Sequence, residues 1–323
     1  MSRDPRFRAA RRLRVVHAAR FQAGILSRSQ VRSLGLTADE VQAEVEAGRW
    51  QPRGASCLLV SPDDGVGRSD WWLAVLEAAP RSAVEGAPRA ALGGVTALVA
   101  AGLEGVHGDR LIHVVAPKSS HPVPAAPGVR IHETRRWTDD DVIRVGGIPC
   151  VRPAVACVQA AIWARTDREA ALMLCSPIQQ RVTAAHEVAE VLRRIRRDRR
   201  RTFMVSVVAE IGGGAQSLNE LDFAVLCRRR GLPEPDRQVL VTGPNGRAYL
   251  DVRWARWKVV VEVDGVGHLR VDRWIDDSLR HNEIALRGGT VLRVPSLGLR
   301  LDEDVHMAVV ERALVAAGWR RGT

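Results

Sequence analysis

The sequence has few lysines, no regularly spaced cysteines and no long apolar run. Lys118 and Lys258 are its two lysines, so nearly all basic residues are arginine, a bias that a GC-rich genome produces. The five cysteines are scattered and lack CxxC spacing, which argues against a disulfide framework or a zinc ribbon and favours a reducing cytosol. No apolar stretch approaches the ~20 residues of a membrane span. The Arg-rich N-terminus has no hydrophobic segment after it, so we expect a cytoplasmic protein with no membrane partner.

The chain is long and strongly basic. Its 323 residues are enough for two or three domains, and 46% of them are hydrophobic, as in ordinary globular proteins. A net charge of +11 and a pI of about 10.8 favour a polyanionic partner, and nucleic acid is the most common one. We therefore expect DNA as a partner.

The first 60 residues predict a basic arm followed by a winged helix-turn-helix. Residues 1–20 contain seven arginines against Asp4 and form the expected arm. Residues 21–60 then predict a helix, a turn at Gly35 and a second helix, which Thr37 and Glu40 begin as a capping box and Gly48 ends. A short two-stranded wing is expected between residues 50 and 60.

This N-terminal pattern resembles the N-terminal domain of abortive-infection antitoxins of type IV toxin–antitoxin systems. The resemblance implies binding to DNA or to a partner protein such as a toxin. The second helix is acidic, with Asp39, Glu40, Glu44 and Glu46, and would repel phosphates. Either the arm and the wing contact DNA, or the module is structural or binds protein, including a homodimer partner. The candidate DNA contacts here are Arg11, Arg12, Arg14, Arg49 and Arg53.

Residues 61–201 predict a mixed α/β middle region, with a weaker resemblance to the middle region of the same antitoxins. Helices are expected at 71–79, 95–102, 151–163 and 168–174, and strands at 111–115 and 129–132. We find no catalytic constellation in this region. His113 and His132 fall in the strand patterns, where structural histidines are expected.

The middle region ends in a run of arginines. Residues 193–201 hold seven arginines and one aspartate, a local charge of +6, and continue a helical pattern from His186. This run is either a solvated face or a phosphate-binding patch, with Arg193, Arg194, Arg196, Arg197 and Arg200 as candidate contacts. Three glycines at 212–214 predict a linker over residues 202–214 and a boundary near 215.

Residues 215–323 predict a mixed α/β domain that is compatible with a restriction-endonuclease-like core. Strands at 237–241 and 247–254 flank a strong hairpin signal at 243–246, and a central strand is expected at 258–264. Further elements are a strand at 290–294 and helices at 217–230, 271–287 and 302–317. The chain as a whole is expected to be a multidomain α/β protein.

Three carboxylates on two neighbouring strands are the most informative feature of the sequence. Asp251 lies in one strand, and Glu262 and Asp264 lie at the end of the next. Strand alternation places Lys258, Glu262 and Asp264 on one face. A buried strand tolerates two acidic residues only where a cation holds them. An acidic cluster of this kind suits Mg²⁺ or Mn²⁺, which indicates phosphodiester hydrolysis.

These residues resemble the very-short-patch-repair-type endonucleases, which carry the PD-(D/E)xK signature. The matching positions are Ser217, Glu220, Asp251, Glu262, Asp264, Gly265, His268, Asp277, Arg280 and Arg293. The resemblance spans about residues 215–318 and implies a Mg²⁺-dependent nuclease-type fold. The signature lysine is replaced by Asp264, so Lys258, Arg280 or Arg293 would supply the cation. Arginine cannot act as a base, which leaves His268 or a metal-activated water to accept the proton.

The expected roles follow from this resemblance. Asp251 and Glu262, with Asp264, ligate the metal, and Glu220 holds a second metal or a metal-bound water. His268 orients the water or protonates the leaving oxygen, and Arg280 or Arg293 clamps the phosphate.

Each site residue also has a structural interpretation. Glu220 can complete a capping box with Ser217, Asp251 can close the hairpin, His268 can cap a loop, and Lys258 can be a charge at a strand edge. Glu262 and Asp264 can pair with Arg280 and Arg293 without any metal.

Three functional hypotheses remain at this stage. The leading one is a metal-dependent DNA endonuclease or nickase that acts in phage defence or DNA repair. The second is a non-catalytic antitoxin or transcriptional regulator with a degenerate nuclease core. The third is a nucleic-acid-binding adaptor that relies on the arm and the arginine run.

Overall fold

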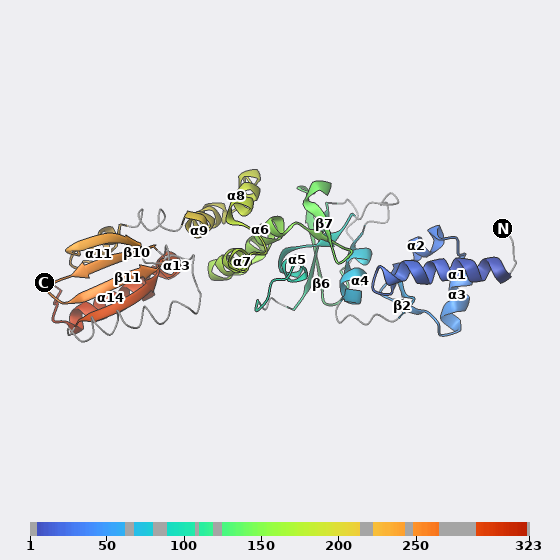
Figure 1. Cartoon of the computed structure of the whole chain (residues 1–323), viewed down its shortest axis with the longest axis horizontal. Helices are drawn as coiled ribbons and strands as arrows, with labels where there is room; N and C mark the ends of the chain where they lie inside the picture. The colour runs from blue at the N-terminus through green and yellow to red at the C-terminus, as the bar shows by residue number, and fades with distance from the viewer. Residues whose placement is uncertain are drawn as a thin grey trace. The chain divides into compact units, whose positions relative to one another are not determined.

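The protein is a mixed α/β chain that divides into two compact units. A computed structural model describes residues 5–61, 68–79, 89–106, 110–118, 125–213, 222–242, 248–264 and 289–321. The units are Met1–Trp163 and Ala164–Thr323, and three sheets are distributed between them (Figure 1). This division falls after residue 163, whereas the sequence predicts boundaries after residues 201 and 214.

Residues 5–60 form one small body with its own core. Its elements in chain order are α1 (Pro5–Arg20), β1 (Ile25–Ser27), α2 (Arg28–Ser33), α3 (Ala38–Glu46), β2 (Gln51–Arg53) and β3 (Cys57–Leu59). The sheet order is β1-β3-β2, so the predicted two-stranded hairpin gains a third strand. Val15 and Ala19 of α1 are buried with Leu26, Trp50 and Leu58. Residues 5–20 are therefore a packed helix, which corrects the expectation of a separate basic arm.

Both ends of α3 lie where the sequence predicts them. Thr37 accepts a hydrogen bond from the backbone N–H of Glu40, and the Glu40 carboxylate accepts one from the backbone N–H of Thr37. This reciprocal pair is the capping box that the sequence predicts at the start of α3. Gly48, with φ of +67°, follows the Ala47 C-cap and adopts the left-handed conformation that ends many helices.

The turn of the β2–β3 hairpin is bound by a carboxylate from the next helix, α4 (Arg68–Ala78). Glu77 accepts hydrogen bonds from the backbone N–H groups of Ala55, at 3.2 Å, and Ser56, at 2.7 Å. The Ser56 hydroxyl donates a third, at 2.9 Å. Burial alone would raise the pKa of Glu77, but the hydrogen bonds from Ser56 and Cys57 hold it below its usual value. The turn is thus fixed by a charged group outside the hairpin.

The rest of the first unit is a five-stranded sheet with helices. Its strands are β4 (Ala91–Leu92), β5 (Ile112–Pro117), β6 (Val129–Thr134), β7 (Val142–Val145) and β8 (Ile148–Val151), in the order β6-β5-β4-β8-β7. Helices α5 (Gly94–Ala100) and α6 (Pro153–Trp163) agree with the sequence expectation. Strands β4, β7 and β8 were not predicted. Strand β4 has two residues, and Pro149 in β8 argues against a strand although the position is buried.

His113 and His132 lie in this sheet as structural side chains. His113 Nδ1 and His132 Nε2 are 3.0 Å apart on the paired strands β5 and β6. The His132 ring stacks on Trp163 with ring centroids 3.4 Å apart. Gly94 makes room for this indole, because a Cβ there would lie 2.5 Å from the Trp163 ring.

The second unit begins with three helices. They are α7 (Asp167–Gln179), α8 (Ala185–Arg194) and α9 (Arg201–Gly213). The expected linker over residues 202–214 is therefore helix through Gly213, and the helical pattern expected to continue through residues 193–201 stops at Arg194. Met204, Val207 and Val208 explain the helix, since their spacing of three and four residues buries one face.

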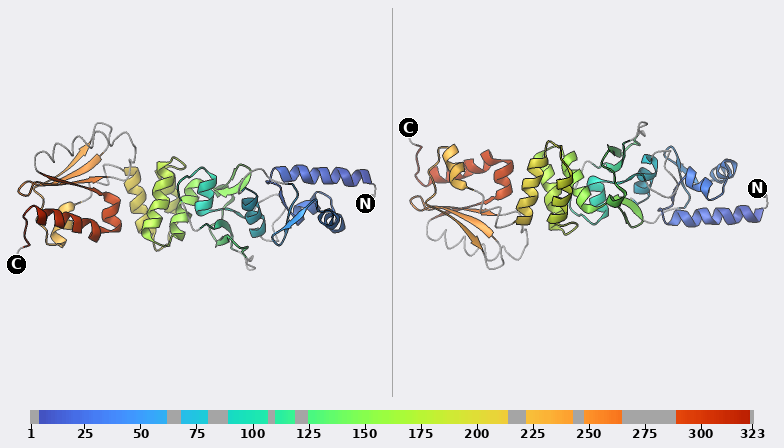
Figure 2. Two further views of the ribbon diagram at one scale, coloured as in Figure 1. Left: turned by 90° about the horizontal axis from the view of Figure 1, so that it is seen from below. Right: turned by 90° about the horizontal axis from the view of Figure 1, so that it is seen from above.

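A four-stranded sheet with helices on one face completes the second unit. Its strands are β9 (Arg237–Thr242), β10 (Ala248–Trp254), β11 (Val259–Asp264) and β12 (Thr290–Pro295), in the order β12-β11-β10-β9. Strand β11 is parallel to β12 and antiparallel to β10. The helices are α11 (Phe223–Arg229), α13 (Ser296–Leu301) and α14 (Glu303–Ala316). Figure 2 shows these helices on a single face of the sheet.

The apolar core of this part lies between that face and the helices. Alternate strand residues such as Leu250, Val252, Val261 and Val263 are buried against helix residues that include Phe223. The side chains between them in sequence point to the other face of the sheet. That second face carries the predicted carboxylates.

Candidate functional site

Asp251 and Glu262 lie side by side on neighbouring strands. They are register partners in the antiparallel β10–β11 pair, and Glu262 is the register partner of Arg293 in the parallel β11–β12 pair. Residues directly opposite one another in a sheet project to the same face, with Cβ atoms about 4.5–5.5 Å apart in an antiparallel pair. Asp251, Glu262 and Arg293 therefore form one row across three strands.

Both carboxylates of this row are buried. Asp251 is 5% exposed and Glu262 is 4% exposed, although they belong to the face opposite the apolar core. Burying an ionised carboxylate is costly unless a cation or hydrogen-bond donors compensate it. Two such groups opposite one another on neighbouring strands therefore require positive charge close by.

Two arginines on the same face supply positive charge. Arg253 Nε lies 3.1 Å from both carboxylate oxygens of Asp251, and Arg253 Nη2 lies 2.7 Å from Oδ2. Arg293 Nε lies 3.5 Å from Glu262 Oε2. Each carboxylate therefore has its own guanidinium partner. Both arginine side chains remain partly exposed, at 42% and 28%, so water can reach the outer side of the row.

Arg253 is not among the site residues that the sequence predicts, because the nuclease signature does not include its position. It lies two residues after Asp251 in the same strand. The strand alternation that places Glu262 and Asp264 on one face also places Arg253 beside Asp251, so the sequence does contain a signal for it.

Lys258 and Asp264 lie at opposite ends of β11. Lys258 is an exposed turn residue before the strand, with φ of +52°, and does not belong to the strand as the sequence predicts. Four residues of extended strand, about 13 Å, separate it from Glu262. Lys258 therefore does not replace the signature lysine. Asp264 is partly buried at the end of β11, on the face that carries Glu262.

Three further predicted site residues, Glu220, His268 and Arg280, lie outside the described residues. Within the described ranges, no group of three His, Cys, Asp or Glu side chains is arranged to hold a metal ion. Mg²⁺, however, is commonly bound by one or two carboxylates, with water completing the octahedron. The oxygen donors of Asp251 and Glu262, in adjacent register positions on one face, fit that requirement.

The predicted DNA contacts of the first unit are largely engaged in ion pairs. Arg11 pairs with Glu40, and Arg12 and Arg49 lie 3.8 and 2.6 Å from the buried Glu44. A hydrogen bond from the Thr37 backbone N–H and the charge of Arg11 lower the pKa of Glu40. The acidic residues of α3 thus hold α1 in place. Arg14 and Arg53, the other two candidates, are exposed.

The arginine run contains both exposed and buried side chains. Arg193, Arg194, Arg196 and Arg197 are exposed, as expected for phosphate contacts. Arg200 is 6% exposed, and its guanidinium is bonded within the protein, so its assignment as a phosphate contact is corrected.

The five cysteines are structural. Cys57, Cys150, Cys157, Cys175 and Cys227 are all buried, and none of these five forms a disulfide, as the sequence predicts. Burial raises the pKa of Cys150, Cys175 and Cys227 to about 12. A thiol with so high a pKa is a poor nucleophile and metal ligand near neutral pH.

No helix in the described ranges is long and apolar enough to cross a bilayer.

Comparisons with known proteins add little to this picture. No protein-family model matches the chain, and no curated protein matches it. Among solved structures, the chain is similar to the crystal structure of RV2827C protein from Mycobacterium tuberculosis. The identity is 14%, the TM-score is 0.39, and the similarity covers 67% of this chain and 82% of that chain. A similarity of this degree carries no conclusion about activity.

Proposed function

We propose that the C-terminal part of the chain is a Mg²⁺- or Mn²⁺-dependent DNA endonuclease or nickase. The observation that carries this proposal is the row of Asp251, Glu262 and Arg293 across β10, β11 and β12. Two buried carboxylates lie side by side, and each has a partly exposed arginine next to it. The carboxylates suit a divalent cation, and the arginines suit a phosphate. The strand order β12-β11-β10-β9, with helices on one face, supports a restriction-endonuclease-like core as the finer description of this fold.

We also propose that residues 5–60 are a winged helix-turn-helix. The succession of α2, the turn at Gly35, α3 and the β2–β3 hairpin supports this description. Its acidic second helix does not favour contact with phosphates. In this proposal the module binds a protein partner or has a structural role, and the contacts with DNA are made by other parts of the chain.

The row of side chains suggests how the residues divide the work. When bound, Mg²⁺ lowers the pKa of a coordinated water and offsets charge that develops on the phosphate. Asp251 and Glu262 would bind the cation through carboxylate oxygens. Arginine cannot act as a general base. Arg253 and Arg293 would therefore orient the carboxylates or bind phosphate oxygens. Asp264, on the same face, would supply a further carboxylate oxygen for the cation.

Nicking of supercoiled plasmid tests the proposal. Wild-type protein should convert supercoiled plasmid to the open-circular form with Mg²⁺ or Mn²⁺ and not with EDTA. Asp251→Asn and Glu262→Gln keep the side-chain shape and should lose at least about 100-fold in rate, the scale of a metal ligand or an electrostatic group. Asp236→Asn, an exposed carboxylate before β9, is the matched control and should keep full rate. Equal rates in all four proteins would contradict the proposal.

One observation favours a second candidate function. Asp251 and Glu262 each have an arginine partner, so both charges can be compensated without a metal. In that case the sheet is a non-catalytic scaffold, and the chain is an antitoxin or transcriptional regulator. Absence of cleavage by folded wild-type protein on supercoiled, linear and single-stranded DNA, with either metal, would favour this second function.

A further inference from the structure

The end of α8 and the segment that follows it present arginines without any exposed apolar side chain. We define the α8–α9 arginine loop as residues 193–199, which are the last two residues of α8 and the five residues after them. Its exposed residues are Arg193, Arg194, Arg196, Arg197 and Arg199. Ile195, the one apolar residue, is buried. The centres of protein–protein interfaces are enriched in apolar and aromatic side chains, whereas phosphate backbones are contacted mainly by arginine, lysine and other hydrogen-bond donors.

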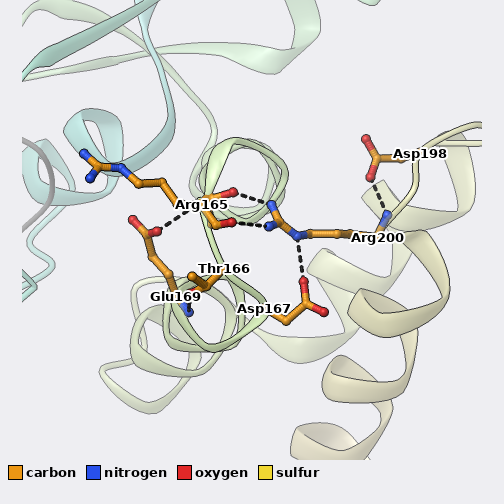
Figure 3. Close-up of polar contacts among 7 residues, drawn as sticks. Arg165, Thr166, Asp167, Glu169, Asp198 and Arg200 are labelled. Atoms are coloured by element: carbon orange, nitrogen blue, oxygen red, sulfur yellow. Dashed lines mark hydrogen bonds and ion pairs between the residues drawn. The ribbon is translucent and has the colours of Figure 1, made fainter. Parts of the chain in front are cut away.

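The loop is fixed from behind by Arg200. Its guanidinium donates hydrogen bonds to Asp167 Oδ1, at 2.8 Å, and to the backbone carbonyls of Arg165, at 3.0 Å, and Ala164. Figure 3 shows Arg200 directed at the turn that precedes α7, while the Arg165 side chain extends away from it. An arginine so engaged cannot bind phosphate, but it fixes the position of its neighbours.

Two further bonds shape the loop. Arg201 Nε donates to the carbonyl of Ile195, at 2.6 Å, which closes the loop on itself. Asp198 accepts a hydrogen bond from the Arg200 backbone N–H, at 2.9 Å (Figure 3). The single acidic residue of the loop therefore holds the backbone, and the arginines on either side of it, Arg197 and Arg199, are exposed.

Helix α9 connects this loop to the four-stranded sheet of the second unit and its helices, which we call the sheet domain. Nine residues after Arg201, Glu210 is 0% exposed and is bonded by Ser296 and by Arg300 Nε, at 2.7 Å, both from α13. Helix α13 follows directly on β12, the strand that carries Arg293. One buried carboxylate thus ties the helix that begins at the loop to the part of the chain that carries the carboxylate row.

The sheet domain itself has little positive charge to offer. Residues 215–323 contain 17 basic and 15 acidic side chains, a net charge of +2. In the first unit, Arg11, Arg12 and Arg49 are engaged with glutamates. Leu13 of α1 and Phe21, the residue directly after this helix, are each 68% exposed, so this surface is partly apolar.

We propose that the α8–α9 arginine loop is the surface that binds the phosphate backbone of duplex DNA for this protein. The inference rests on the proposed nuclease function for its biological sense, but it concerns a different surface and is tested separately. A loop held by Arg200 and Arg201 presents several guanidinium groups with little loss of conformational entropy. Such a contact carries no sequence information, so it binds duplexes of different sequence alike.

The test is the salt dependence of DNA binding by the full-length chain. The probe is a fluorescein-labelled duplex, measured by anisotropy in EDTA so that no cleavage occurs. In the variant Arg193→Gln, Arg196→Gln, Arg199→Gln, the slope of the log binding constant against log salt concentration should become less negative by about 2–3. Each lost phosphate contact contributes about 0.9 to this slope. The charge-matched variant Arg32→Gln, Arg89→Gln, Arg135→Gln removes three exposed arginines from the first unit and should leave the slope within about 1 of wild type.

Specific outcomes overturn the inference. Equal losses in the two triple variants would show that net charge alone matters, and an unchanged slope in the loop variant would exclude the loop. Tighter binding of wild-type protein to duplex RNA or to polyglutamate than to duplex DNA would also overturn it. Thermal unfolding of both variants should match wild type, because all six positions are exposed.

The two proposals can fail separately. If wild-type protein nicks no plasmid but the loop variant loses DNA binding, the nuclease assignment fails and the loop assignment is supported. If plasmid is nicked but the loop variant keeps the wild-type slope, the nuclease assignment is supported and the loop assignment is overturned.

Discussion

Asp251 and Glu262 are direct register partners across β10 and β11, and each is bound by a guanidinium from its own or the next strand. Two arrangements of charge are compatible with this relationship. The two carboxylates can share a divalent cation, or each can remain with its arginine. The partial exposure of Arg253 and Arg293 permits both states, because each guanidinium can swing toward a phosphate while the buried carboxylates stay in place.

The first prediction concerns Arg253. Arg253→Gln should lower the free energy of unfolding of the second unit in EDTA by about 1–3 kcal/mol, because the buried Asp251 carboxylate loses three hydrogen-bonding contacts. Urea unfolding followed by tryptophan fluorescence measures this change. Arg237→Gln is the matched control, since Arg237 is the exposed register partner of Arg253 on β9. A loss no larger than that of the control would show that Arg253 does not compensate Asp251.

The second prediction concerns Glu210. Glu210→Gln should destabilise the second unit by about 1–3 kcal/mol, because it replaces a buried carboxylate that accepts hydrogen bonds from Ser296 and from the exposed Arg300. Ser296→Ala removes only a hydroxyl from the same cluster and should cost about 1 kcal/mol. Urea unfolding again provides the measurement. A larger effect from the serine variant than from the glutamate variant would contradict this description of the α9–α13 contact.

The third prediction is a pH dependence that Glu77 controls. Hydrogen bonds from the β2–β3 turn lower the pKa of Glu77 in the folded protein. Its contribution to stability is therefore complete above the ordinary carboxyl pKa and is lost as pH falls through the lower folded value. Glu77→Gln should be less stable than wild type at pH 7, and the difference should shrink on acidification below pH ~4. Thermal unfolding across pH tests this, with the exposed Glu104→Gln as control. A difference that grows at low pH would have the wrong sign.

The fourth prediction concerns the thiols. A thiol with a pKa of about 12 is ionised in about one molecule in 10⁴ at pH 8, and only the thiolate attacks a disulfide. Native protein should therefore react slowly with a disulfide reagent such as DTNB, and all five thiols should react at once in denaturant. Rapid reaction of even one thiol in the native protein would show that its burial is incomplete.

The sequence predicts those features that depend on local pattern. Alternation along β11 correctly separates the valine face from the acidic face, and the Thr37–Glu40 capping box correctly begins α3. These predictions succeed because strand alternation and helix capping involve only neighbouring residues.

Features that depend on distant partners could not be predicted in the same way. Arg200 stands among similar arginines, and its burial depends on carbonyls 35 and 36 residues away. Lys258 continues an apolar strand pattern in the sequence, yet it adopts the left-handed conformation of a turn residue, which is uncommon for lysine. The three glycines at 212–214 predict a linker over residues 202–214, but most of this segment forms helix α9. The helix is stabilised by burial of Met204, Val207 and Val208, which depends on the elements packed against them.

The central claim is that Asp251 and Glu262 together bind a divalent cation. The most direct measurement is titration of Mn²⁺ into the full-length protein, followed by the loss of the free-ion EPR signal, for wild type, Asp251→Asn, Glu262→Gln and the control Asp236→Asn. If these two carboxylates form the site, wild type and the control should bind Mn²⁺, and Asp251→Asn and Glu262→Gln should each lose that binding. Equal Mn²⁺ binding by all four proteins would contradict it, because the two carboxylates would then serve only their arginine partners.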